Sequence, residues 1–166
     1  WRDNSYITKG YTFKLEVHFD KWQKILGDEY VIVFKPHYLI VNDFDIDQYQ
    51  GFVYFVEANE DISNLYIIAD ALVTDYSSVF FDYAILKRPI YFYMYDRSNY
   101  QHQLRGFYLD VDKDLPGKVY ENEDENQLLE EIKKGYDYQR LDKFNQRFNN
   151  HEDGKASKRV VDIVFK

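Results

Sequence analysis

The 166-residue sequence contains no cysteine, which excludes disulfide bonds and metal sites with cysteine ligands. This absence suits a cytoplasmic protein. The sequence also has no apolar run near the roughly 20 residues that a membrane-spanning helix needs. Glycine-rich phosphate loops of the GxxxxGK(S/T) and GxGxxG types are missing as well, so the usual sequence signs of ATP and NAD binding are absent.

Basic residues are outnumbered by acidic ones. Lysine and arginine total 21 against 29 aspartate and glutamate residues, which gives a net charge of −8 and a pI near 5.0. This balance argues against a nucleic-acid-binding protein. Any phosphate site in the chain therefore needs local positive charge or a second, basic component. The acidic segments 41–47 and 121–125 are interpreted as solvated faces, because their spacing does not fit a calcium-binding loop.

Hydrophobic and charged contents of 45% and 30% fit one globular domain with a full-sized core. We expect strands at residues 30–34, 51–56, 71–74 and 90–94. We expect helices in the second half of 13–27, over 62–69, from the serines at 77 and 78 to 87, and over 121–134, 136–148 and 156–165. The last of these should turn Val160, Val161 and Val164 inward. Residues 95–118 should be mostly loop. Strands alternating with helices predict an α/β fold, a single Rossmann-like domain over residues 1–166 with one parallel sheet and helices on both faces.

The polar stretch Thr74–Ser78 directly follows the third expected strand and precedes a helix. Backbone N–H groups at a helix start and hydroxyl side chains can together bind a phosphate group. Ser77 and Ser78 are therefore candidate phosphate ligands, although helix capping is the commoner role of such serines. Asp75 could take part in catalysis or simply accept hydrogen bonds from loop amides. Asp82, about one helical turn further on, could reach a ribose hydroxyl or be a solvated helix residue.

A second candidate, His37, follows the first strand, which should stop at Pro36 because proline lacks an N–H donor. In parallel sheets ligands bind at the carboxyl ends of the strands, so His37 and Thr74–Ser78 should share one edge. Histidine can contact a ligand or transfer a proton near neutral pH. A polar loop residue without function is an equally good interpretation. Positive charge around the strand ends is expected from Lys87, Arg88, Arg97 and Arg105.

Several motifs occur together in a fixed order along the chain. They are WRDN at residues 1–4, KPHY at 35–38, TDYSSVFFDYA at 74–84 with LKRP after it, YDRSNY, LRGFY, LPG, and HEDGKAS at 151–157. No single motif is specific, but the combination resembles the C-terminal half of the CDP-glycerol glycerophosphotransferases, the teichoic acid polymerases and primases of Gram-positive cell walls. The resemblance covers nearly the whole chain.

This resemblance implies a GT-B fold, in which two Rossmann-like domains face a cleft and the C-terminal one binds the CDP-linked donor. An acceptor hydroxyl would attack the β-phosphorus of CDP-glycerol, and CMP would leave. The N-terminal acceptor domain is absent from this chain, and with it a second histidine and the membrane-associating surface. The chain alone should therefore bind CDP-glycerol weakly without turning it over. The longer enzyme would be cytoplasmic, peripheral at the inner face of the membrane, and would act on a teichoic acid acceptor.

The resemblance also implies a role for each candidate residue. His37 would act at the pyrophosphate or assist proton transfer. The residues implied to bind the CDP-glycerol diphosphate are Thr74, Asp75, Ser77, Ser78 and Arg105. Asp82 would contact the ribose. No residue is implied as a metal ligand and no cofactor is evident, although a divalent cation could assist at the pyrophosphate.

Two alternatives stay open at this point. Ribitol-phosphate transferases share these motifs, so the donor could be CDP-ribitol. The chain could also be a non-catalytic interaction module that keeps the fold. Intact His37, Ser77 and Ser78 favour the enzyme. Polymerase and primase cannot be separated, because the length of the acceptor is set elsewhere.

Overall fold

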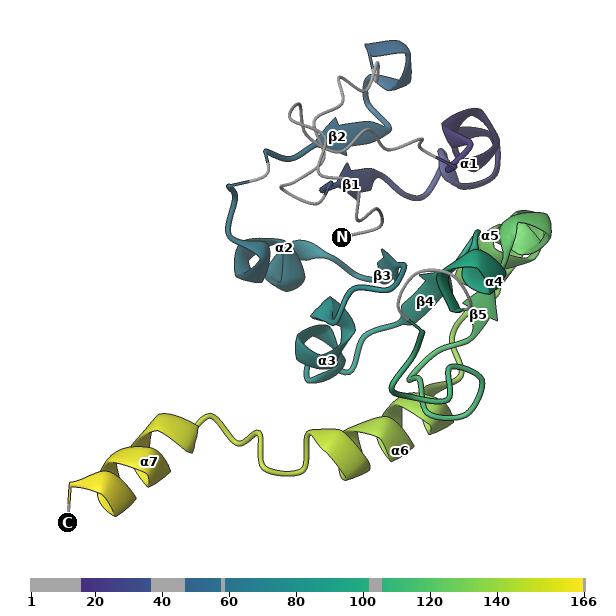
Figure 1. Ribbon diagram of the computed structural model, residues 1–166. Helices are drawn as coiled ribbons and strands as arrows, with labels where there is room; N and C mark the ends of the chain where they lie inside the picture. The colour runs from purple at the N-terminus through teal and green to yellow at the C-terminus, as the bar shows by residue number, and fades with distance from the viewer. Residues whose placement is uncertain (1–15, 37–46, 58, 102–105, 166) are drawn as a thin grey trace, which may run out of the picture.

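The computed structural model describes residues 16–36, 47–57, 59–101 and 106–165 (Figure 1). Its strands are β1 (Ile32–Phe34), β2 (Val53–Phe55), β3 (Leu72–Thr74), β4 (Ile90–Tyr93) and β5 (Val119–Tyr120). Its helices are α1 (Phe19–Leu26), α2 (Ile62–Ile68), α3 (Val79–Ala84), α4 (Arg97–Asn99), α5 (Glu125–Lys134), α6 (Tyr138–Phe148) and α7 (Ala156–Val164), with short 3-10 turns η1 (Asp47–Tyr49) and η3 (Asn122–Asp124).

All strand pairs in these ranges are parallel, so the predicted α/β class is confirmed. One sheet was expected, however, and the described strands form two, a pair β1–β2 and a triplet β3–β4–β5 (Figure 1). Apolar runs predict where strands lie. They do not say which strands exchange backbone hydrogen bonds, and that information decides the number of sheets.

Strand β4 is the centre of the core, and all four of its residues are buried. Its side chains alternate between the two faces of the sheet, as strand geometry requires. Tyr91 and Tyr93 pack in a cluster with buried residues of α1 and α5. Ile90 and Phe92 pack in a second cluster with buried residues of α3 and α6. Helices therefore cover both faces of the three-stranded sheet.

Two short elements fall where no regular structure was expected. Strand β5 adds to the sheet through the register Phe92 with Val119 and Tyr93 with Tyr120. A two-residue strand shows no alternation of apolar and polar residues, and its place is set by pairing with β4 alone. Helix α4 is a single turn inside the segment that was expected to be loop.

Glu125, the first residue of α5, is a buried carboxylate that joins α5 to α1. Its side chain is only 1% exposed. Its two oxygens accept hydrogen bonds from the His18 backbone N–H at 3.1 Å, Lys21 Nζ at 2.7 Å and Trp22 Nε1 at 2.9 Å, and His18 Nδ1 lies 3.0 Å away. Burial alone would raise the pKa of Glu125, but these hydrogen bonds outweigh it and lower the pKa. The solvated-face interpretation is therefore wrong at Glu125.

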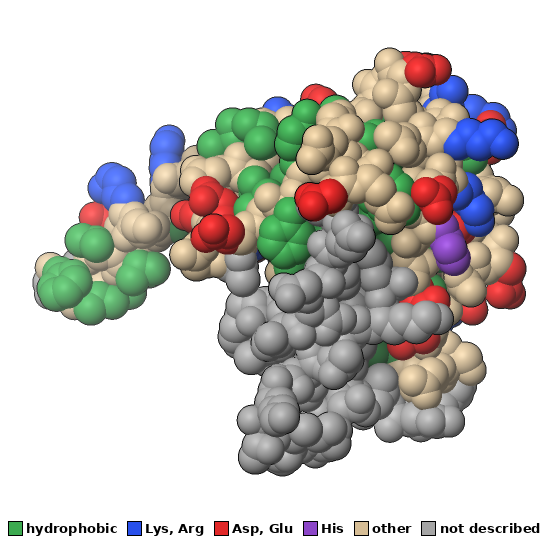
Figure 2. Space-filling view, turned by 90° about the horizontal axis from the view of Figure 1, so that it is seen from above, with side chains coloured by type: hydrophobic (Ala, Val, Ile, Leu, Met, Phe, Trp, Pro, Cys, Tyr) green, Lys and Arg blue, Asp and Glu red, His purple; other side chains and the backbone are tan. Residues whose placement is uncertain are grey.

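Helix α7 lies at the end of the chain, beyond α6, and is exposed throughout (Figures 1 and 2). The sequence pattern predicted that Val160, Val161 and Val164 face inward. Their exposed fractions are 58%, 51% and 63%, so this prediction is wrong for the described chain. The apolar stripe exists, but periodicity identifies a stripe without identifying the surface that covers it.

Candidate functional site

The candidate site is built on the connection between β3 and α3. Strand β3 pairs with β4 as far as Thr74, opposite Phe92, and residues 75–78 then lead into α3. The strand ends at Thr74, where the sequence changes from apolar to polar residues. This places Thr74, Asp75, Ser77 and Ser78 at the carboxyl edge of the three-stranded sheet, where ligands of parallel sheets bind.

The two serines make little use of their hydroxyl groups for capping. Ser78 is the N-cap of α3, yet its side chain makes no capping hydrogen bond. Ser77 Oγ accepts only a long hydrogen bond, at 3.5 Å, from the Val79 N–H. Capping was the commoner explanation of these serines, and the geometry gives it weak support.

Exposure increases along this connection. Thr74, Asp75 and Ser77 are half-buried, whereas Ser78 is exposed. Asp82, one turn into α3, is also exposed and lies on a helix whose buried face holds other residues. These positions let solvent or a ligand reach the serines and Asp82 from outside the sheet.

His37 and Arg105 lie outside the described residues, so their roles stay predictions. The strand before His37 ends as expected: β1 stops at Phe34, and Lys35 donates from Nζ to the carbonyl of Glu57 at 3.0 Å. Strand β1 belongs to the two-stranded sheet and β3 to the three-stranded one. The strand before His37 and the strand before the serines therefore belong to different sheets in the described part of the chain, so the expected common sheet edge is not found there.

The expected positive charge around the strand ends is largely used elsewhere. Lys87 and Arg88 come just before β4, at its amino end and thus at the edge opposite to the serines. Arg88 also donates to three carbonyls at the end of α2, those of Tyr66, Ile67 and Ala69. Lys87 and Arg88 therefore do not supply positive charge at the serine edge, because a residue that precedes a parallel strand lies at the opposite edge.

Arg97, which follows β4, does lie on the carboxyl side of the sheet, but acidic partners engage it. Its guanidinium donates to Asp112 Oδ2 at 2.6 Å and lies 3.7 Å from Glu121 Oε1. Hydrogen bonding to Asp112 is the main cause that raises the pKa of Arg97. Its charge therefore stabilises the fold around β4 and β5 more than it serves an anion.

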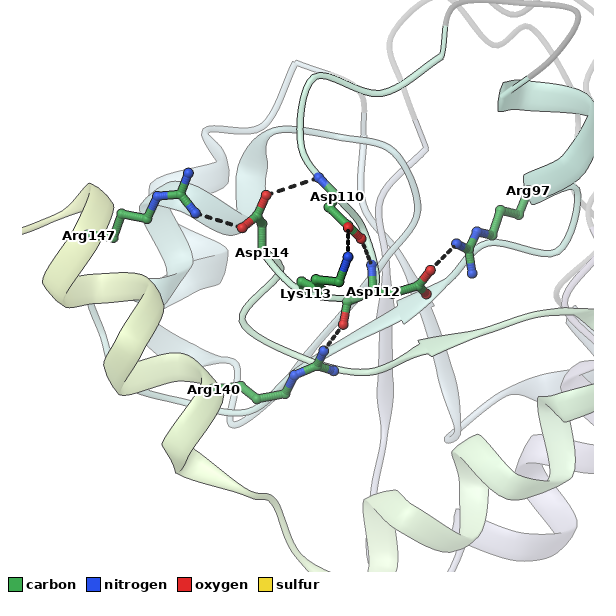
Figure 3. Close-up of polar contacts among 7 residues, drawn as sticks. All are labelled: Arg97, Asp110, Asp112, Lys113, Asp114, Arg140 and Arg147. Carbon is green, nitrogen blue, oxygen red and sulfur yellow. Dashed lines mark hydrogen bonds and ion pairs between the residues drawn. The ribbon is translucent and has the colours of Figure 1, made fainter.

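Figure 3 shows polar contacts that hold residues 110–114, in the segment between α4 and β5. Arg140 of α6 donates to the backbone carbonyls of Asp112 and Gly117, and Arg147 binds Asp114 at 2.6 Å. Asp110 binds Lys113 at 2.6 Å, which lowers the pKa of Asp110. The carboxylates of this segment are thus engaged with protein donors, and within the described ranges no group of three acidic or histidine side chains could hold a metal ion.

Sequence reasoning missed an aromatic cluster beside the serines. The rings of Tyr76 and Tyr100 stack with centroids 3.8 Å apart, and Phe107 packs against both at 5.9 and 5.3 Å. The Tyr76 hydroxyl donates to Asp96 Oδ1 at 2.7 Å. The sequence feature that could have indicated this cluster is Tyr76, an aromatic residue within the otherwise polar stretch Thr74–Ser78. Tyr108, in contrast, is fully exposed.

None of the helices that the structure describes is long and apolar enough to cross a membrane.

Comparison with known proteins identifies relatives along the whole chain. Residues 1–166 match the family described as CDP-Glycerol:Poly(glycerophosphate) glycerophosphotransferase. A teichoic acid glycerol-phosphate transferase of Staphylococcus aureus is 44% identical over 171 residues, which covers 100% of this chain and 43% of that protein. A teichoic acid poly(glycerol phosphate) polymerase of Staphylococcus epidermidis is 42% identical over 171 residues, covering 100% of this chain and 24% of that protein.

A solved structure of the wall teichoic acid polymerase TagF superposes on this chain with a TM-score of 0.80 and 43% sequence identity. The match covers 99% of this chain and 41% of that one. The chain therefore spans less than half the length of each of these three relatives.

Proposed function

Because this chain belongs to the CDP-glycerol:poly(glycerophosphate) glycerophosphotransferase family, we propose that it supplies the donor-binding half of a glycerol phosphate transferase. The donor is CDP-glycerol, and the acceptor is a poly(glycerol phosphate) chain or its linkage unit in teichoic acid synthesis. The carrying observation is the match to TagF over 99% of the chain at 43% identity. The three-stranded parallel sheet with helices on both faces supports the finer proposal of a Rossmann-like donor domain of the GT-B type.

The connection after β3 is the proposed diphosphate site. Ser77 and Ser78 present hydroxyl groups that capping scarcely uses, at the sheet edge where ligands bind. Thr74 and Asp75 shape the connection, and Arg105 supplies positive charge to the diphosphate. Asp82, exposed one helical turn away, contacts the ribose hydroxyls.

The transfer step follows from the chemistry of phosphoryl transfer. An acceptor hydroxyl oxygen forms a bond to the β-phosphorus of CDP-glycerol, and the bond from that phosphorus to the bridging oxygen breaks, so CMP leaves with the electron pair. The hydroxyl proton passes to a general base, for which we propose His37. The protein contributes by holding the diphosphate and by stabilising the charge that develops on its oxygens.

The rest of the reaction requires groups outside this chain. With a net charge of −8, the chain is poorly suited to hold a diphosphate unaided. We place the second histidine, the acceptor site and the surface that associates with the inner face of the membrane in the longer part of the enzyme. This chain alone then binds CDP-glycerol but does not turn it over.

Replacing both serines with alanine should weaken binding of CDP-glycerol. Hydrogen bonds to charged groups contribute about 1.5–3 kcal/mol each, so the Ser77→Ala, Ser78→Ala double variant should bind at least roughly a hundredfold more weakly. Isothermal titration calorimetry of the chain with CDP-glycerol measures this, and CDP-ribitol titrated in parallel compares the two polyols.

Ser98→Ala is the matched control, because Ser98 is exposed in α4 and has no place in the proposed site. It should bind like the wild type. Unchanged affinity in the double variant would contradict the proposed diphosphate site. A folded wild-type chain that bound no CDP-glycerol at millimolar concentration would instead favour the interaction module.

A further inference from the structure

The connection between β3 and α3 carries Ser77 and Ser78, the proposed ligands of the diphosphate. It is only residues 75–78 long, and the hydroxyls of its serines contribute little capping. A binding site gains affinity when its groups are already held in the bound geometry. The question is therefore which side chain holds Ser77 and Ser78 in place before a ligand arrives.

Tyr76, between Asp75 and Ser77, is tied to the next segment along the sheet by two contacts of different kinds. Its ring lies parallel to that of Tyr100, with an interplanar angle of 8° and centroids 3.8 Å apart. Its hydroxyl donates to Asp96 Oδ1 at 2.7 Å, a short hydrogen bond to a charged acceptor. Stacking on Tyr100 fixes the plane of the Tyr76 ring, and the hydrogen bond to Asp96 fixes the position of the ring within that plane.

Asp96 and Tyr100 themselves belong to a segment that is anchored to the sheet. The N–H of Met94 donates to the carbonyl of Tyr120, and Arg97 binds Asp112 and approaches Glu121. Tyr76, next to the serines, is therefore bonded to Asp96. The following residue, Arg97, is bonded to Asp112 in the segment shown in Figure 3. The serine-bearing connection is held against a framework that α6 also fixes.

We propose that Tyr76 and Asp96 are positioning residues that hold the donor-binding serines in their bound geometry. This inference rests on the proposed function, because it assigns Ser77 and Ser78 to the donor. Neither residue needs to touch the ligand. They act through the backbone: the hydrogen bond from the Tyr76 hydroxyl to Asp96 fixes the position of Tyr76, and with it the position of the adjoining serines.

Tyr76→Phe tests the hydrogen bond while keeping the ring stack. We expect the dissociation constant for CDP-glycerol to rise about fivefold, since the lost bond is to a charged but partly exposed acceptor. Amide hydrogen exchange at Ser77 and Ser78 should accelerate by a similar factor in the chain without ligand. Asp96→Asn keeps an acceptor oxygen and should stay near wild type, whereas Asp96→Ala should match Tyr76→Phe. The double variant Tyr76→Phe, Asp96→Ala should be no worse than either single variant.

Tyr49→Phe is the matched control. The Tyr49 hydroxyl donates to Asp20 Oδ1 at 3.0 Å, and its ring packs on Phe19, so the same type of contact is removed beside the two-stranded sheet. This variant should lose a comparable amount of stability without changing CDP-glycerol affinity or exchange at the serines. A purely structural role of Tyr76 would make the two variants alike.

The outcomes separate this inference from the proposed function. If the serine double variant weakens binding and Tyr76→Phe leaves both affinity and exchange unchanged, the positioning role is overturned and the donor site stands. If the wild-type chain binds no CDP-glycerol, the donor site fails and the positioning of a donor fails with it. Weaker binding together with faster exchange in Tyr76→Phe, but not in Tyr49→Phe, supports the inference.

Discussion

Replacing Glu125 with alanine is expected to lower the free energy of unfolding by about 3 kcal/mol, the low end of what removing one partner of a buried ion pair costs. The carboxylate is 1% exposed and accepts hydrogen bonds from His18, Lys21 and Trp22. Alanine leaves the Trp22 N–H buried without its acceptor. Urea denaturation followed by circular dichroism measures the change.

Glu130→Ala is the control, because Glu130 is an exposed residue of the same helix. Its effect should stay within about 0.5 kcal/mol, as for most surface substitutions. Equal stability of the two variants would show that the contacts of Glu125 contribute nothing net to the fold.

The lowered pKa of Glu125 also sets the sign of a pH effect. A carboxyl group with a folded-state pKa below its ordinary value stabilises the fold fully above that value and loses this contribution as the pH falls through the folded pKa. The ordinary value is 4.5. The stability difference between the wild type and Glu125→Gln should therefore be largest near neutral pH and shrink below about pH 4.5. A difference that grew on acidification would contradict the assigned direction.

His37→Ala is expected to reduce glycerol phosphate transfer at least about a hundredfold in the full-length enzyme, since general acid–base groups contribute roughly 10²–10⁴ in rate. CMP release from CDP-glycerol in the presence of acceptor measures it. Affinity for CDP-glycerol should change much less, because the proposed role is proton transfer. Removing a proton acceptor lowers the turnover rate more than it weakens ground-state binding.

The exposed His151, between α6 and α7, offers a matched histidine for comparison. His151→Ala should transfer glycerol phosphate at the wild-type rate. If His37→Ala transferred glycerol phosphate at a near-normal rate, His37 would be a polar loop residue without a catalytic role.

The sequence predicted the regular elements well where long apolar patterns carry them. The four expected strands and the helices α1, α2, α3, α5, α6 and α7 lie in or within a residue or two of the predicted ranges. Strand β5 was not predicted, because two residues are too few to show a period. The described strands form two sheets where one was expected, because a hydrophobic pattern does not determine which strands pair.

The contacts of charged and aromatic side chains were harder to predict. Glu125 belongs to an acidic segment, so composition suggested solvent exposure. Its burial is compensated by donors from Lys21 and Trp22 of α1 and from His18, the residue just before that helix. Arg88 lies at the wrong edge of the sheet and serves the end of α2. Tyr76 owes its importance to Asp96 and Tyr100, about 20 residues away, and no local pattern shows such a partner.

The most direct test of the donor-binding proposal is a titration of the isotope-labelled chain with CDP-glycerol, followed by backbone amide chemical shifts. We predict saturable shifts at residues 74–82 with a dissociation constant in the millimolar range, and no comparable shifts in α7, which lies beyond α6. Absence of shifts at residues 74–82 at millimolar CDP-glycerol, in a chain whose spectrum shows it to be folded, would contradict the account.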